Sequence, residues 1–191
     1  KVLVSEMGGT LFTIAKDVKV QIEFNPTKVS EYRLIGYESR ILAAKDFNDD
    51  RKDAGELGAG HNVTALYELI PPGSKSSDGV DALKYQTQQV KSSSSDILTV
   101  KLRYKKPDGK KSILLSQVHK ELKASWEEAS DAFKLAAGVA AFAMRLQNSK
   151  HQSKNSWELV KSLLAQVKLS DDQGYRAELD TLVTKAQAFS K

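Results

Sequence analysis

The stretch LTVKLRYKKPDGKKSILLSQV, residues 98–118, decides the fold. Its first part places Leu98, Val100, Leu102 and Tyr104 at alternate positions, and a period of two is typical of a strand with one buried face. Pro107-Asp108-Gly109 then favours a tight turn, and residues 113–118 follow as a second apolar segment. Because a connection this short joins antiparallel strands, the stretch predicts an antiparallel hairpin.

Three segments before this hairpin also predict strands. Residues 18–24 alternate Val18, Val20, Ile22 and Phe24 with polar side chains, and we expect further strands at residues 32–38 and 63–69. Proline ends two of them, in Asn25-Pro26 and Pro71-Pro72-Gly73, since it gives no donor to a strand ladder. No helix of the length found in βαβ units separates these segments. We therefore expect an antiparallel β-sandwich-like domain over residues 17–120.

The two ends of the chain show helical spacing instead. Leu3, Met7, Leu11 and Ile14 recur at steps of four, four and three, which predicts a helix over residues 1–16. Residues 121–191 predict a C-terminal helical segment of about three helices. The expected class is α+β: an N-terminal helix, the antiparallel β-sandwich-like domain, and this helical segment.

Each C-terminal helix has a predicted start or a predicted apolar face. Ser125 and Glu128 form a capping box for the first helix, and Asn155 with Glu158 caps the second. The faces comprise Trp126, Ala129, Phe133, Ala136, Ala140 and Met144 in the first helix, Trp157, Val160, Leu164 and Val167 in the second, and Tyr175, Leu179, Leu182, Ala186 and Phe189 in the third. We expect both tryptophans in the core, with sugar or protein binding as the alternative.

The composition limits the classes of function. With 191 residues the chain can bury a core, and because none is cysteine, thiol chemistry, disulfides and thiolate metal sites are excluded. The net charge of +5 comes from 29 basic and 24 acidic residues, which are intermixed along the chain. The densest basic cluster, Lys105, Lys106, Lys110 and Lys111, brackets the hairpin turn. We expect it to keep a sheet edge solvated, and we expect no nucleic-acid partner.

Membrane insertion is not expected either. The longest uncharged run, residues 135–144, is shorter than the roughly 20 residues of a membrane-spanning helix, so no transmembrane segment is predicted. The first residues do not have the pattern of a signal peptide, and we expect the chain to begin inside a longer polypeptide.

An acidic segment at residues 46–53 is the best candidate for chemistry. Asp46, Asn48 and Asp50 occupy alternate positions, with Asp53 close behind, and oxygen ligands of this kind can surround a hard cation such as calcium. The segment is not an EF-hand, since Arg51 replaces the required glycine and Leu57 the required glutamate. The alternative is that the carboxylates cap turns and pair with neighbouring basic residues, namely Lys45, Arg51 and Lys52. We predict no metal site, and these four residues are the ligands to test.

No other constellation predicts an enzyme. The glycine-rich residues 55–60 lack both the Gly-Lys-Ser/Thr sequence and the following helix of a phosphate-binding loop, so we expect a turn there. His61, His119 and His151 are scattered, and no Gly-x-Ser-x-Gly elbow supports a hydrolase. We predict no catalytic residues, no cofactor and no enzymatic activity.

Several segments resemble a known family. Residues 11–26, LFTIAKDVKVQIEFNP, resemble the exit from the type A domain in bacterial von Willebrand factor type A proteins. The segments at 32–38, 46–50, 52–56 and 58–61 are similar to the extension that follows this domain. The resemblance covers essentially the whole chain and is most specific over residues 11–69.

The resemblance implies a location and a context. Residues 1–16 are then the last helix of a preceding type A domain, and the protein is extracytoplasmic, in the periplasm or at the cell surface, with any lipid anchor upstream. The family's metal-dependent adhesion motif, Asp-x-Ser-x-Ser, does not occur in this chain, because Ser92-Ser93-Ser94-Ser95-Asp96 has the wrong order. No adhesion-site metal is therefore implied.

These features together predict a non-catalytic C-terminal adaptor region that acts in protein–protein interaction or scaffolding at the cell envelope. The partner is expected to be a protein, and the adjacent type A domain of the same chain is a neighbour that the resemblance supplies. The alternative is a calcium- or carbohydrate-dependent ligand-binding module that uses residues 46–53.

Overall fold

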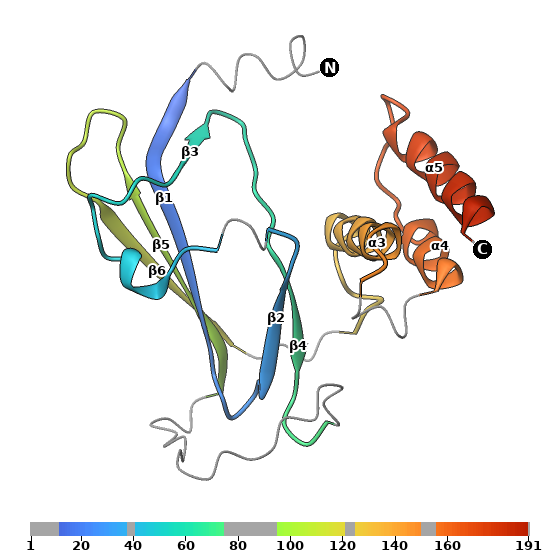
Figure 1. Ribbon diagram of the computed structural model, residues 1–191, viewed down its shortest axis with the longest axis horizontal. Coiled ribbons are helices and arrows are strands. Elements are labelled where there is room, and N and C mark those ends of the chain that lie inside the picture. The colour runs from blue at the N-terminus through green and yellow to red at the C-terminus, as the bar shows by residue number, and fades with distance from the viewer. Residues whose placement is uncertain (1–11, 38–40, 75–94, 121–124, 150–155, 191) are drawn as a thin grey trace. The chain divides into compact units, whose positions relative to one another are not determined.

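A computed structural model describes residues 12–37, 41–74, 95–120, 125–149 and 156–190 (Figure 1). The chain divides into two compact units, Lys1–Leu122 and Lys123–Lys191, and each is described by itself. Within the described residues, the first unit contains the strands and the second contains three α-helices. This is the α+β class that the change of period predicts, with antiparallel sheets and a helical C-terminal region.

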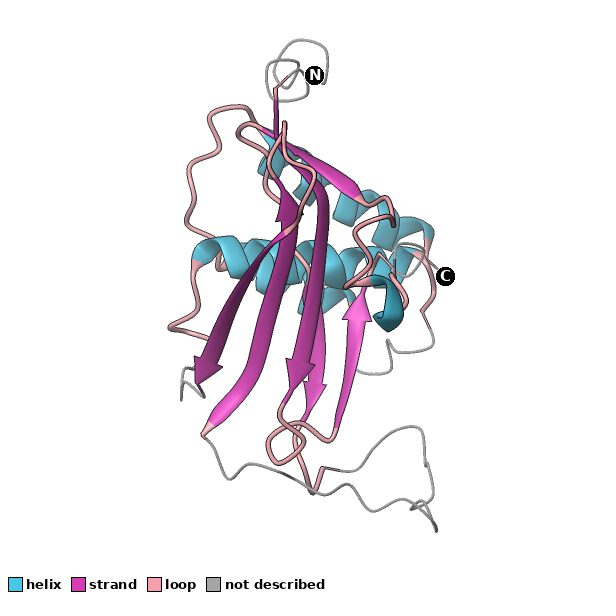
Figure 2. Cartoon of the chain, turned by 90° about the vertical axis from the view of Figure 1, so that its left-hand side faces the viewer, coloured by secondary structure: helices cyan, strands magenta, loops and turns pink. Residues whose placement is uncertain are grey.

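The predicted hairpin lies within a four-stranded antiparallel sheet. Strand β5 (Asp96–Lys105) pairs with β6 (Ile113–Lys120), and the amide of Gly109 donates to the carbonyl of Lys106 (2.9 Å) in the turn. Strand β1 (Thr13–Phe24) pairs with β5 on one side and with β3 (Gly55–Gly58) on the other. The strand order is therefore β3-β1-β5-β6, and Figure 2 shows the long strands of this sheet running side by side.

The N-terminal helix predicted over residues 1–16 is wrong where the structure describes it. Residues 1–11 lie outside the described residues, but Thr13 begins β1, and Thr13 and Ala15 pair with Gly58 and Leu57. A helical spacing is a weak signal where a cross-strand partner is available, because strand formation depends on the neighbour more than on the segment itself. The same pairing turns the glycine-rich segment, expected to be a loop, into β3.

A bulge in β1 changes which side chains are buried. Asp17 has a φ of +48°, and the pairing with β5 shifts register between Lys16 and Lys19. Aspartate tolerates this left-handed geometry better than most other residues. Beyond the bulge Lys19 is only 3% exposed, whereas Val20, expected on the buried face, is 56% exposed.

A second, two-stranded sheet packs at the end of β1. Its antiparallel strands β2 (Glu31–Ile35) and β4 (Leu66–Ile70) correspond to the strands predicted at residues 32–38 and 63–69, with different ends. The ring centre of Phe24 lies 4.5 Å from that of Tyr32 and 5.5 Å from that of Tyr67. These aromatic contacts join the two sheets.

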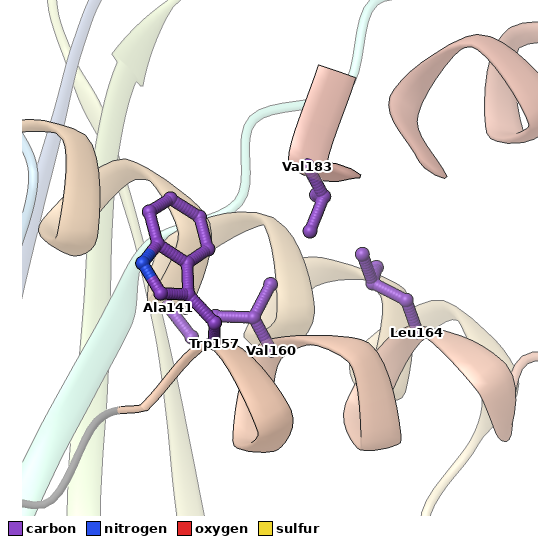
Figure 3. Close-up of a cluster of buried hydrophobic side chains, with 5 residues drawn as sticks. All are labelled: Ala141, Trp157, Val160, Leu164 and Val183. Atoms are coloured by element: carbon purple, nitrogen blue, oxygen red, sulfur yellow. The ribbon is translucent and has the colours of Figure 1, made fainter. Parts of the chain in front are cut away.

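The second unit is built from α3 (Asp131–Leu146), α4 (Trp157–Ala165) and α5 (Tyr175–Phe189). The side chains of Ser130 and Ser156 accept hydrogen bonds from the amides of Phe133 and Leu159 and so cap α3 and α4. A buried cluster holds the helices together (Figure 3), and it comprises Ala141, Trp157, Val160, Leu164 and Val183. Of the helices in the described part of the chain, none has the length and apolar character needed to cross a membrane.

The predicted helix faces are correct for α4 and shifted for the other two. Trp157, Val160, Leu164 and Val167 are all buried, as expected, although Ser156 rather than Asn155 is the cap and Asn155 lies outside the described residues. In α5 the predicted residues Leu179 and Ala186 pack against the buried cluster, but the buried residue is Val183, and the predicted residues Leu182 and Phe189 are 49% and 86% exposed.

In α3 the buried positions are Lys134, Gly138 and Ala141 rather than the predicted stripe. The helix begins at Asp131, five residues after Trp126, and Ser130 is its cap. The predicted capping-box contact, in which Glu128 accepts from the amide of Ser125 (2.9 Å), lies in a separate turn before the helix. The absence of a side chain at Gly138 explains the shifted face. A β-carbon there would lie 2.6 Å from Cδ2 of Leu164, so glycine permits the close approach of α3 and α4.

Candidate functional site

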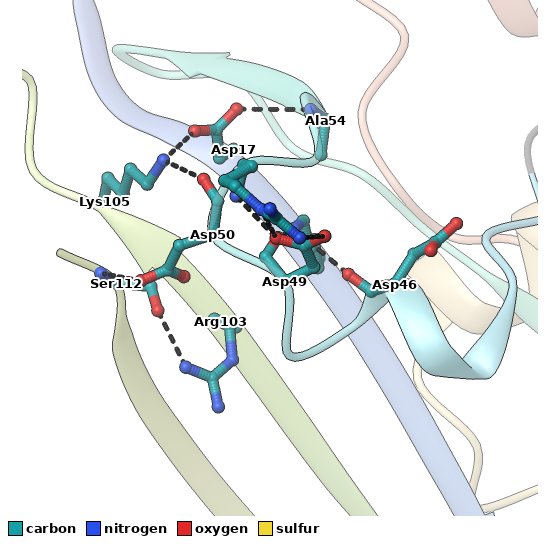
Figure 4. Close-up of polar contacts among 10 residues, drawn as sticks. Asp17, Asp46, Asp49, Asp50, Ala54, Arg103, Lys105 and Ser112 are labelled. Atoms are coloured by element: carbon teal, nitrogen blue, oxygen red, sulfur yellow. Dashed lines mark hydrogen bonds and ion pairs between the residues drawn. The ribbon is translucent and has the colours of Figure 1, made fainter. Parts of the chain in front are cut away.

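The acidic loop, residues 46–53, lies against the polar side of β1 and β5 (Figure 4). It follows a short 3-10 helix, η2 (Ala44–Asp46), and the side chain of Phe47 is only 5% exposed. The guanidinium carbon of Arg103 lies 5.5 Å from the centre of the Phe47 ring. The buried aromatic ring therefore anchors the loop and brings its polar groups within reach of the strands.

Three basic side chains, here called the basic row, hold this loop: Lys19 on β1, and Arg103 and Lys105 on β5. The ammonium of Lys19 donates to the backbone carbonyls of Asp46 (3.2 Å) and Asp49 (2.5 Å). Lys19 is 3% exposed, so its ammonium has lost most of its hydrating water, and the two carbonyls take the place of that water as hydrogen-bond acceptors. The ammonium of a lysine thus lies at the point where two backbone oxygen atoms of the loop come together.

Lys105 connects the bulge in β1 to the acidic loop. Its ammonium lies 2.7 Å from Oδ2 of Asp17, and the two side chains are 14% and 19% exposed. The same ammonium donates to the carbonyl of Asp50 (2.7 Å). The hydrogen bond with Lys105 lowers the pKa of Asp17, and the reciprocal contact raises the pKa of Lys105. Asp17 also accepts from the amide of Ala54 (3.2 Å), so the charged pair fixes the end of the loop.

Arg103 holds the middle of the acidic loop. Its guanidinium donates to Oδ1 of Asn48 (2.9 Å) and to Oγ of Ser112 (2.7 Å). The amide of Ser112 donates to Oδ2 of Asp50 (3.3 Å), and hydrogen bonding from Ser112 lowers the pKa of that carboxyl group. The start of β6 is thereby tied to the loop as well.

Within the loop, Asp49 forms a local turn with Arg51. Its carboxylate accepts from the amide (2.9 Å) and from Nε (3.1 Å) of Arg51, and these contacts lower the pKa of Asp49 to about 2. This contact is the turn-capping role that the sequence offered as the alternative to metal binding. The pair is exposed at the arginine, so its contribution is local.

The four candidate ligands named from the sequence therefore have defined positions. Asn48 binds Arg103 through its side chain, Asp46 and Asp50 present backbone carbonyls to the basic row, and Asp53 is exposed. Among the residues that the structure describes, no group of three His, Asp or Glu side chains is placed to hold a metal ion. The carbonyls of Asp46, Asp49 and Asp50 and the side chain of Asn48 accept from the protein's own cations, which makes the arrangement a structural clamp, whereas Oδ1 of Asp50 is buried without a hydrogen-bond partner. The absence of a metal site at this loop stays a prediction, and calcium binding stays its alternative.

The sequence did not reveal the basic row. Lys19 fell on the side of β1 assigned to solvent, and Lys105 was assigned to a solvated hairpin cluster, whereas its side chain is 14% exposed and paired. The available signal was Asp17, because an aspartate that interrupts an apolar alternation suits a bulge with positive φ.

The opposite side of the four-stranded sheet carries an apolar face. Strand register assigns to it Val20, Ile22 and Phe24 on β1, Leu98, Val100 and Leu102 on β5, and Ile113 and Leu115 on β6. At one end of this face Phe24 contacts Tyr32 on β2 and Tyr67 on β4, and further along it Val20 and Leu115 are 56% and 51% exposed. Among the described residues of the unit Lys1–Leu122, the buried apolar side chains are Ala15, Val29 and Phe47, so this face is not a closed core.

The family model described as "Uncharacterized protein YfbK, C-terminal" matches residues 9–189 of the chain. The chain belongs to this family. It is also 42% identical to the "Uncharacterized protein YfbK" of Escherichia coli (strain K12) over 193 aligned residues, which cover all of this chain. The chain spans 33% of the length of that relative. No solved structure matches the chain.

Proposed function

We propose that the chain is a non-catalytic C-terminal adaptor region of an exported bacterial von Willebrand factor type A protein. It acts in protein–protein interaction or scaffolding at the cell envelope. The resemblance of residues 11–69 to the extension that follows a type A domain supports this context. The relative is about three times as long as its matched region, which supports a domain within a larger protein.

The apolar face of the four-stranded sheet, partly buried but exposed at Val20 and Leu115, is the observation that carries the proposal. Burying apolar surface contributes roughly 25 cal/mol per Å², so a row such as Val20, Leu102 and Leu115 is stabilised when another layer covers it. The polar side of the same sheet already holds the acidic loop. Docking through the apolar face is therefore the arrangement that the sheet favours, and the type A domain of the same polypeptide is the proposed neighbour.

The chemistry of the acidic loop is consistent with a role without turnover. The basic side chains that face the loop donate hydrogen bonds to its backbone, as Lys19 does to the carbonyls of Asp46 and Asp49 and Lys105 does to the carbonyl of Asp50. A general acid or base needs a proton that can be exchanged with a substrate, and a clamp of this kind does not supply one.

A charge placed on the apolar face tests the proposal. Val20→Asp is compared in the 191-residue chain and in the full-length protein, with Val63→Asp as the matched control, because Val63 is 72% exposed and lies outside the strands. We expect Val20→Asp to lower the unfolding free energy by about 2 kcal/mol or more in the full-length protein, where the charge would be buried, and much less in the isolated chain. Thermal unfolding followed by circular dichroism measures both.

Equal, small effects of Val20→Asp in both proteins would remove the support for this docking surface. The control Val63→Asp should change neither protein by more than about 0.5 kcal/mol. Location is tested separately by fractionating cells that produce the full-length protein, and recovery in the cytoplasm alone would contradict export.

A further inference from the structure

Strand β6 forms one edge of the four-stranded sheet, and its features differ from those of a protected edge. The other edge, β3, has four residues and an irregular register with β1. By contrast, β6 has eight residues and pairs with β5 without a register shift from Ile113 to His119. Natural edge strands are commonly protected by short length, bulges, proline or charge, whereas β6 contains no proline and its one lysine, Lys120, is its last residue.

The backbone groups that face away from the sheet can be assigned. The carbonyl of Ile97 accepts from Asn25, which continues β1. Because hydrogen-bonding sides alternate along a strand, Thr99 and Lys101 also face β1, and Val100 and Leu102 face β6. Their β6 partners Gln117 and Leu115 then face β5. It follows that Leu114, Ser116 and Val118 direct their amides and carbonyls away from the sheet.

Three apolar side chains along this edge are exposed. Leu114 and Val118 are 48% and 46% exposed on one side of β6, and Leu115 is 51% exposed on the other. An outward row of backbone groups flanked by such side chains is the arrangement that strand pairing between chains uses.

We propose that β6 pairs in antiparallel orientation with β6 of a second copy of this chain, about a two-fold axis at Ser116. In this register Ser116 lies opposite its own copy, and Leu114 lies opposite Val118 twice. On the other side of the sheet Leu115 lies opposite Gln117. The pairing uses the edge of the sheet rather than the apolar face, and it does not depend on the proposed function.

Charge and polarity select this register over its neighbours. A two-fold axis perpendicular to the joined sheet keeps each side chain on its own face. The axis therefore lies between one residue of β6 and the same residue of the second copy. Centred on Leu115, the pairing places Lys120 opposite Lys110 and opposes like charges. Centred on Gln117, it places Lys120 opposite Leu114 and Val118 opposite Ser116. Only the register centred on Ser116 opposes Leu114 with Val118 and places Lys120 opposite the uncharged Ser112.

Single cysteines test the register, because the chain contains none. With Ser116→Cys we expect oxidation to give a disulfide-linked dimer, since directly opposed residues have Cα atoms about 4.5–5.5 Å apart, within the range of disulfides. Gln117→Cys is the matched control on the adjacent residue of the same exposed strand. Its two copies would be offset by two residues and so more than about 7 Å apart, which disfavours the bond.

Charges introduced at Leu114 and Val118 test the dimer without crosslinking. Sedimentation of the full 191-residue chain should show a concentration-dependent dimer, which Leu114→Glu weakens at least about tenfold in Kd by placing a charge opposite Val118. Adding Val118→Lys to Leu114→Glu places opposite charges across both pairs and should restore most of the affinity. Circular dichroism checks that each variant folds. A parent chain that is monomeric at about 0.1 mM, a dimer unaffected by Leu114→Glu, or equal crosslinking of Ser116→Cys and Gln117→Cys would overturn the proposal.

Discussion

Lys19 shows how a single residue depends on the backbone of a distant segment. Its ammonium is buried without a carboxylate at its hydrogen-bonding positions, and the carbonyls of Asp46 and Asp49 accept its donors. Desolvation of a charge is costly unless hydrogen bonds replace the lost water, so the lysine and the acidic loop stabilise each other. Lys52, which is exposed in the acidic loop, keeps its hydrating water and so does not depend on backbone acceptors in this way.

We expect Lys19→Met to destabilise the sheet unit by about 2–3 kcal/mol, because hydrogen bonds to charged groups contribute about 1.5–3 kcal/mol each and methionine preserves the volume. Amide hydrogen exchange along β1 and β5 measures the effect. Lys52→Met is the matched control and should change exchange little. If Lys19→Met is as mild as Lys52→Met, the lysine does not hold the loop.

At the scale of elements, periodicity in the sequence predicted the strands and helix faces that depend mainly on residues close together in the chain. The period of two in residues 98–104 and the turn at Pro107-Asp108-Gly109 predicted the β5–β6 hairpin, and the four positions predicted as the buried face of the second C-terminal helix are all buried. The buried face of α3 was not predictable in the same way. Its position depends on the approach of Leu164 to Gly138, and a glycine in a helix offers no apolar signal to a periodicity argument.

Gly138→Ala tests that packing. Alanine favours a helix over glycine by about 1 kcal/mol, but its β-carbon would lie 2.6 Å from Cδ2 of Leu164, and overpacking costs about 1–3 kcal/mol. We expect a net destabilisation of about 1 kcal/mol. In the background Leu164→Ala, which makes room, the same change should instead stabilise. Unfolding followed by the fluorescence of Trp126 and Trp157 measures both, and equal effects in the two backgrounds would contradict the close approach.

At the scale of the whole molecule, the α+β class and the order of strands before helices followed from the sequence, but the long-range pairing did not. Strand β1 joins β3 and β5, which lie about forty and eighty positions further along the chain, and periodicity carries no information about such partners. The error at residues 13–16 and the missed basic row have this one origin. The role of the bulge at Asp17 follows from its contact with Lys105, which also binds the acidic loop, and both partners are distant in sequence.

The same network predicts how the sheet unit responds to acid. The pKa values of Asp17, Asp49 and Asp50 are all lowered in the folded protein, by hydrogen bonds from Lys105, Arg51 and Ser112 respectively. Such carboxylates stabilise the fold above their unfolded pKa of about 3.9, and this contribution is lost as pH falls through the folded pKa, about 2 for Asp49. Stability should therefore decline between about pH 4 and pH 2, to an extent that hydrogen exchange in β1 and β5 reports.

Asp17→Asn isolates one term of this decline, because asparagine also tolerates the positive φ at the bulge but carries no charge. At pH 7 we expect the variant to be less stable than the parent, since Lys105 loses its carboxylate partner. The difference should shrink as pH falls through the lowered pKa of Asp17, where the parent's carboxylate becomes protonated too. At high pH the raised pKa of Lys105 predicts the converse: the parent loses the contribution of this pair as pH rises above about 10.4 and through the folded pKa, and the variant loses less. A variant as stable as the parent at pH 7 would mean that the carboxylate of Asp17 does not stabilise the fold through its charge.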